Sequence, residues 1–177
     1  MAPDPRDTLW EAVFDTYYSA YFEEILSDLL INRWLRIDIG VRVGIALTAS
    51  GSAVAGWTLW ERPDFKIIWA IISCLAAVGA IFHSTISVPS LLKEHTRSNK
   101  DFTALRHEFE TLRNDLNINP QFDVTKKNHE LKALKKRYTE LCNNSPHDIL
   151  STDKLANKAQ GLLNSRIADI IESKGED

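Results

Sequence analysis

The hydrophobic pattern of the chain separates two uncharged blocks from two charged arms. Residues 43–60 and 67–92 contain no Asp, Glu, Lys or Arg, whereas the arms before and after them carry many charges of both signs. As helices, 43–60 and 67–88 would each span roughly 30 Å, which is the thickness of the hydrocarbon core of a bilayer. The pattern therefore predicts a two-span transmembrane hairpin within residues 37–92, closed by a short polar loop.

Aromatic and basic residues near the block ends support this hairpin and orient it. Trp57, Trp60 and Trp69 gather near the loop, where the aromatic belt of a membrane protein lies. Lys and Arg are more frequent beside the outer ends of the spans than in the loop, which predicts that both termini are cytoplasmic. The alternative is two buried helices of a soluble all-α domain, because Thr48 and Ser52 make the first block only weakly apolar.

The N-terminal arm, residues 1–36, has the pattern of a long amphipathic helix. Thr8 and Glu11 have the spacing of a capping box, and apolar pairs then recur every four residues as far as Leu30. A four-residue period exceeds 3.6, so the apolar stripe drifts around the helix and can contact several neighbours. Because this helix is acidic, we expect it to pack against the chain's own tail or another subunit instead of an anionic lipid surface.

The C-terminal arm, residues 93–177, is predicted to be a cytoplasmic helical region. Its first helix carries apolar residues at alternating spacings of three and four, which is the pattern of a heptad seam. The seam comprises Phe102, Leu105, Phe109, Leu112 and Leu116. The sequences NINP at 117–120 and NNSP at 143–146 divide the arm into three helices. The whole chain is therefore predicted to be all-α, with the seam as a candidate surface for assembly.

Small side chains recur every four residues along the first block and are matched in the second. The set comprises Gly40, Gly44, Thr48, Ser52 and Gly56, with Ala76 and Ala80 in the second block. In lipid, such small-residue faces let two helix backbones approach closely. The contact can form within one hairpin or between chains, and the many small residues of the first block favour a homo-oligomer. In that case Thr48 and Ser52 are candidates to line a water path.

The charge balance adds one candidate binding surface. The chain has 21 basic and 24 acidic residues, so bulk attraction to nucleic acid is not expected, and neither is sequence-specific nucleic-acid binding. Basic side chains concentrate only in the second helix of the C-terminal arm. This cluster comprises Lys126, Lys127, Lys135, Lys136 and Arg137. It is interpreted either as a contact for lipid headgroups or another anionic partner, or as a solvated helix face.

Candidate chemistry in the sequence is sparse. His83, with Ser84 beside it, would lie in the inner third of the second span, where it could form the inner mouth of a pore; the alternative is a neutral histidine that bonds a nearby carbonyl or serine. Cys74 and Cys142 are far apart and are expected to be free, buried thiols. No nucleophile, phosphate-loop or metal-ligand motif is present, so neither enzyme activity nor a cofactor is predicted.

The order of elements resembles a known family of membrane effectors. An amphipathic helix, a hairpin with a very short loop and the helix SLLKEHTRSNKDFTALRHEFETLRNDL, over roughly residues 8–117, resemble SLATT-type two-transmembrane effectors of bacterial antiphage and conflict systems. The resemblance implies an effector of the bacterial inner membrane that oligomerises and permeabilises or depolarises that membrane, so that the infected cell stops growing or dies.

The resemblance also implies a trigger and leaves a rival function open. No sensor domain is recognisable in the chain, so triggering would depend on a separate partner or on the three short helices of its own tail. The partner would be a source of a nucleotide second messenger, or a nucleic-acid or protein complex. The rival function is a non-toxic membrane anchor or scaffold that recruits a cytoplasmic partner through the helical tail.

Overall fold

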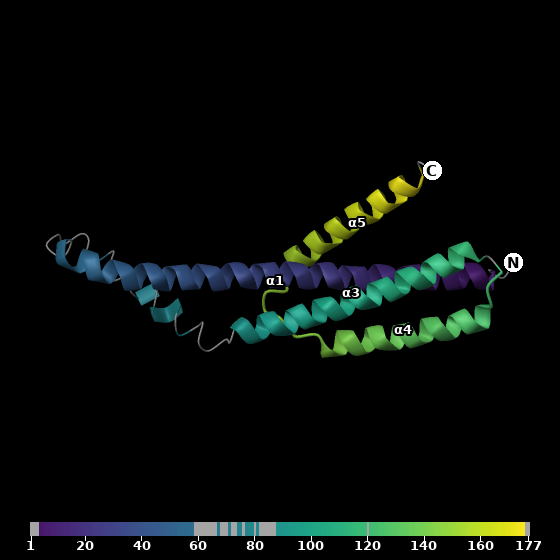
Figure 1. The fold of residues 1–177 in the computed structure, drawn as a ribbon, viewed down its shortest axis with the longest axis horizontal. Coiled ribbons are helices and arrows are strands. Elements are labelled where there is room, and N and C mark those ends of the chain that lie inside the picture. The colour runs from purple at the N-terminus through teal and green to yellow at the C-terminus, as the bar shows by residue number, and fades with distance from the viewer. Residues whose placement is uncertain are drawn as a thin grey trace. The chain divides into compact units, whose positions relative to one another are not determined.

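The computed structural model describes residues 4–58, 67, 71, 74, 75, 77–79, 81, 88–119 and 121–175. Within these residues the chain is all-helical and contains no strand, which confirms the predicted all-α class. The long helices, labelled as in Figure 1, are α1 (Pro5–Thr58), α3 (Val88–Ile118), α4 (Val124–Asn144) and α5 (Asp153–Gly175).

The chain divides into two compact units. The first, which we call the bundle unit, combines Met1–Ile31 with Glu94–Asp177, and the second, the apolar unit, is Asn32–Lys93. The predicted boundary between residues 36 and 37 is not a helix end, because α1 continues without interruption to Thr58. The start of α1 and most of α3 therefore belong to the bundle unit, while the remainder of α1 belongs to the apolar unit.

Helix α1 begins earlier than the capping box predicted. The Asp4 carboxylate accepts a hydrogen bond from the Arg6 backbone N–H at 2.9 Å, and Pro5 follows as the first helical residue. Aspartate at the cap and proline at the first helical position are both favoured, because the cap satisfies a free N–H and proline has none to satisfy. Thr8 lies inside the helix, where its hydroxyl donates to the Asp4 carbonyl, so the Thr8 cap was wrong.

In the bundle unit, α3 runs antiparallel to the first part of α1, and α4 returns along α3 (Figure 1). The seam faces inward: Phe102, Leu105 and Phe109 are 0% exposed. Leu112 and Leu116 are also buried, and all but Phe102 belong to one core cluster with residues of α1, α4 and α5. The α1 members of this cluster are Leu9, Val13, Tyr17, Ala20, Tyr21 and Ile25. The seam is thus filled by the chain's own helices.

The ends of α3 and α4 fall at the predicted breaks. Helix α3 ends at Ile118, and Asp123 caps α4 by accepting hydrogen bonds from the N–H groups of Thr125 and Lys126. Helix α4 ends at Asn144, just before Pro146, which cannot donate a backbone hydrogen bond to continue a helix. The prediction of three helices in the C-terminal arm is confirmed.

The described helices contradict the predicted location. In the part of the chain that the structure describes, no helix combines the length and the apolar character needed to cross a bilayer. The first predicted span falls at the end of α1, where glycine, serine and threonine dilute the apolar residues of 43–58. The prediction of a multi-pass protein of the bacterial inner membrane, with cytoplasmic termini, is therefore wrong. The second predicted span, 67–88, lies outside the described residues except at isolated positions.

The buried seam predicts a large effect on stability when it is truncated. Leu105→Ala should lower the free energy of unfolding by about 2–5 kcal/mol, because it removes buried methyl groups and leaves a cavity. Ile118→Ala is the matched control on the same helix, since Ile118 is 81% exposed, and its effect should stay within about 0.5 kcal/mol. Denaturant unfolding followed by circular dichroism measures both, and equal effects would contradict the packing.

Candidate functional site

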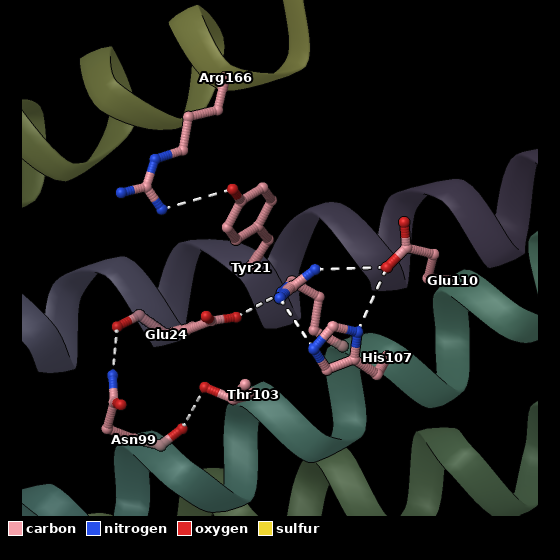
Figure 2. Close-up of polar contacts among 8 residues, drawn as sticks. Tyr21, Glu24, Asn99, Thr103, His107, Glu110 and Arg166 are labelled. Atoms are coloured by element: carbon pink, nitrogen blue, oxygen red, sulfur yellow. Dashed lines mark hydrogen bonds and ion pairs between the residues drawn. The ribbon is translucent and has the colours of Figure 1, made fainter. Parts of the chain in front are cut away.

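Arg106 on α3 lies at the centre of the polar contacts between α1 and α3. Its Nε lies 2.5 Å from Oε2 of Glu24, and its Nη1 lies 3.4 Å from Oε2 of Glu110. Figure 2 shows Glu24 and Glu110 reaching the same guanidinium from opposite sides, with the Tyr21 ring beside it. The guanidinium carbon lies 4.8 Å from the centre of that ring, a cation–π distance. One arginine thus joins a carboxylate and an aromatic ring of α1 to a carboxylate of α3.

A second arginine repeats this arrangement one heptad further along α3. The guanidinium of Arg113 lies 4.8 Å from the centre of the Tyr17 ring. Burial raises the pKa of Tyr17, and the Arg113 charge opposes that shift. The Tyr17 hydroxyl and the Arg113 Nε are buried without a hydrogen-bond partner. The Arg113 charge is compensated by the Tyr17 ring and by Glu110, whose Oε1 lies 3.9 Å from Nη2.

The tyrosines of α1 also hold α5. Arg166 donates a hydrogen bond to the Tyr21 hydroxyl at 3.3 Å, and Figure 2 shows its side chain descending from α5 onto that ring. Tyr18 donates to Asn164 and accepts from Gln160, both on α5. Tyr21 is therefore shared by arginines of two different helices, and we call the contacts of Arg106, Glu24, Tyr21 and Arg166 the arginine clamp.

The predicted basic cluster of α4 separates into two groups. Lys127 lies 3.2 Å from Asp115 and 2.8 Å from Glu130, and Arg137 pairs with Glu108 of α3. These two side chains join α4 to α3. Lys126, Lys135 and Lys136 are exposed on α4, and Lys136 lies 3.8 Å from Glu140 of the same helix. Their contact with an anionic partner stays a prediction.

A polar cavity of about 280 Å³ lies between the middle of α1, the start of α3 and the loop that joins α4 to α5. One wall is formed by His95 of α3 and Asp148 of the loop, whose Nε2 and Oδ2 atoms lie 2.7 Å apart. Both side chains are 2% exposed. This close contact between two buried side chains holds the loop against α3.

Glu23 forms another wall of this cavity. Burial raises the pKa of its carboxyl above the ordinary value of 4.5. Burial raises the pKa values of Tyr138 and Cys142 on α4, and the Glu23 charge adds a smaller increase to both. Cys142 is a free, half-buried thiol whose raised pKa makes it a weak nucleophile. Cys74 is also free, as predicted, but it is exposed instead of buried.

Most of the predicted span residues lie outside what the structure describes. Ala76, Ala80, His83 and Ser84 are outside the described residues altogether. Thr48, Ser52 and Gly56 lie in the helical part of α1, without a described side-chain environment. A Cβ added at Gly40 or Gly44 would meet no neighbouring atom within 4 Å. The first two small residues of the pattern therefore face open space. That the pattern packs one helix against another stays a prediction.

The contacts that matter most in the bundle were not found from the sequence. The arginine clamp, the Arg113–Tyr17 stack and the His95–Asp148 pair all join residues from segments far apart in the chain. One signal was present: Arg106 and Arg113 are seven residues apart beside the seam, and Tyr17 and Tyr21 are four apart on α1. In the described residues, no group of three or more His, Cys, Asp or Glu side chains is placed to hold a metal ion.

The chain matches no protein-family profile, no curated protein and no solved structure. The resemblance to SLATT-type effectors therefore stays a prediction, and function is argued from the residues themselves.

Because of the arginine clamp, we expect two single substitutions of arginine on α3 to lower the free energy of unfolding by different amounts. Arg106→Gln should lower the free energy of unfolding by about 1–3 kcal/mol, because it removes a charged hydrogen bond at a site where both partners are 16% exposed. Arg97→Gln is the control: Arg97 is 86% exposed and 3.9 Å from Asp101, so its effect should stay below about 0.5 kcal/mol. If urea unfolding gives the same midpoint for both variants, the clamp does not stabilise the bundle.

The raised pKa of Glu23 predicts a stability difference that depends on pH. A carboxyl whose pKa rises on folding adds to the free energy of unfolding. This stabilisation is complete below the pKa of the unfolded state and is lost as pH rises through the pKa of the folded state. Glu23→Gln should therefore gain stability relative to the unchanged chain as pH rises from about 4 to about 7. Thermal unfolding across this range tests it, with the exposed Glu11→Gln as the matched control. A gap between Glu23→Gln and the unchanged chain that is constant with pH would contradict burial of Glu23.

Proposed function

We propose that the chain is a non-enzymatic effector that acts by associating with copies of itself through the apolar unit, while the bundle unit holds the seam closed. The observation that carries the proposal is the exposure of large apolar side chains in this part of α1. Leu35, Ile39 and Val43 are 42%, 52% and 50% exposed and follow one another at four-residue spacing, so they lie along one face of the helix. Exposed apolar faces of this kind are typical of interaction sites.

Further residues of the apolar unit support a second copy as the occupant of this face. Ile71 and Leu75 are also exposed. Gly40, beside the face, leaves room for the close approach of another helix. Asp38 is the acidic residue of this stretch of α1, and its Oδ2 lies 2.9 Å from Nε of Arg42 in the same helix. Leu35, Ile39 and Val43 are themselves uncharged, and the two arginines that border them, Arg36 and the Asp38-paired Arg42, lie at the edge of the contact. An apolar face of this kind can be complementary to itself, which suits a contact between identical subunits.

The bundle unit supplies a resting state in this proposal. Its seam residues are covered by α1, α4 and α5, so they add no assembly surface while the bundle is closed. A separate sensor or signal-producing partner would open the bundle and make the seam available to a second chain. The setting in bacterial defence against phage comes from the resemblance to SLATT-type effectors; a membrane-spanning location is not part of the proposal.

The experiment is to express the chain in bacteria and measure oligomer size by chemical crosslinking, together with growth. Ile39→Glu with Val43→Glu should reduce crosslinked oligomers by about tenfold or more, because two carboxylates would have to leave water in the interface. The matched control is Ile149→Glu with Ile171→Glu, at positions of the bundle unit that are 78% and 65% exposed. This control should leave the oligomers unchanged.

Three outcomes separate the alternatives. Oligomers that persist in the Ile39→Glu, Val43→Glu variant would contradict this face as the assembly surface. Growth arrest that disappears together with the oligomers supports the effector. Oligomers that form without any effect on growth would favour the scaffold, which recruits a partner through its helical tail.

A further inference from the structure

The polar cavity of the bundle unit has the lining of a binding site for a small molecule. Its walls come from three segments of the chain that are distant in sequence. The lining residues are Glu23, Leu26, Ser27 and Leu30 of α1, His95 and Ser98 of α3, and Ser145, Pro146, His147, Asp148 and Ser151 of the loop before α5. Its volume of about 280 Å³ is close to the lower end of ordinary ligand pockets, roughly 300 Å³, so an occupant would have few atoms.

Glu23 differs from the other carboxylates near it. Glu24 and Glu110 both contact Arg106, and Glu108 contacts Arg137. In the described part of the chain, Glu23 has no ion-pair or hydrogen-bond partner, and no lysine or arginine lines the cavity. The titratable groups near Glu23 are His95, His147 and Asp148 in the cavity lining, with Tyr138 and Cys142 on α4. A half-buried carboxylate without a cation is costly, because it has lost water and gained no compensating charge.

The remaining walls are joined to one another by polar contacts. His95 and Asp148 are held together at 2.7 Å, and the Asp148 carboxylate also accepts a hydrogen bond from the Leu150 backbone N–H at 2.7 Å. The hydroxyls of Ser98 and Ser145 lie 3.1 Å apart. Hydroxyls accept hydrogen bonds as well as donate them, so they can complete the hydrogen bonding of a cation's N–H groups.

We propose that this cavity binds a small organic ammonium ion, with its nitrogen held by Glu23 and the serine hydroxyls and its hydrocarbon against Leu26 and Leu30. An ammonium supplies the missing positive charge together with three hydrogen-bond donors. A hydrocarbon group of a few carbons suits the two leucines, which line the α1 side of the same cavity. This site does not depend on self-association, and it goes beyond the proposed function.

The placement of the site links binding to the closed bundle. Because α1, α3 and the loop before α5 all contribute to the lining, the complete site exists only when these segments are packed together. A ligand that binds the closed form alone stabilises that form in proportion to its concentration. An ammonium ligand would therefore hold the bundle closed.

The test uses the purified full chain, isobutylammonium chloride as the probe and isobutanol as a neutral control with the same carbon skeleton. Carbon-13 NMR of labelled glutamate side chains follows the Glu23 carboxyl, and thermal unfolding follows stability. Isobutylammonium should move the Glu23 titration to lower pH and raise the unfolding temperature, whereas isobutanol should do neither. Glu23→Gln should weaken the affinity at least tenfold, and the exposed Glu11→Gln should not change it.

A second variant keeps the test decisive if Glu23→Gln disturbs the fold. Ser151 is an exposed residue of the cavity lining, so Ser151→Trp should block entry and abolish the response while leaving Glu23 in place. Equal responses to isobutylammonium and isobutanol, no response to either compound, or unchanged binding by both variants would each overturn the proposal.

Discussion

The stacking of two arginines on two tyrosines fixes how α3 packs on α1. A heptad seam repeats, so apolar packing alone would also tolerate a slip by seven residues. Arg106 contacts Tyr21 and Arg113 contacts Tyr17, in opposite order along the two helices because the helices are antiparallel. A slip by one heptad would leave one of these arginines without its ring, inside a region where both lose most of their water. Both arginines would keep Glu110 of their own helix, but the loss of the Arg106–Glu24 ion pair and of one ring contact from a region with little water disfavours the slipped register.

The remaining contacts of the bundle depend on that register. Once Tyr21 is placed by Arg106, it presents its hydroxyl to Arg166 and so positions α5. With α5 in place, the loop before it brings Asp148 to His95 and closes the cavity beside Glu23. The closed bundle and the cavity therefore form together, which is why we connect the proposed ligand with the resting state.

The sequence predicted the elements of the fold better than it predicted their contacts. Local periodicity and turn residues predicted three features that are present in the structure. These are the all-α class, the helix breaks at 117–120 and 143–146, and the buried seam from Phe102 to Leu116. The start of α1 was wrong because Asp4 and Pro5 form a better cap than Thr8. The predicted membrane location is wrong because no described helix is both long and apolar enough to cross a bilayer; in 43–58, serine, threonine and glycine lower the hydrophobicity although no charge is present. The arginine clamp and the cavity could not be predicted, since each depends on which helices meet.

The central claim is that the seam is filled within a single chain. Hydrogen exchange of the α3 backbone, measured at a series of protein concentrations, tests it most directly, because an intramolecular contact does not depend on concentration. The account predicts that the amides around Leu105 and Phe109 keep the same protection on dilution. Protection that falls in proportion to dilution would show that another chain covers the seam, and would contradict the closed bundle.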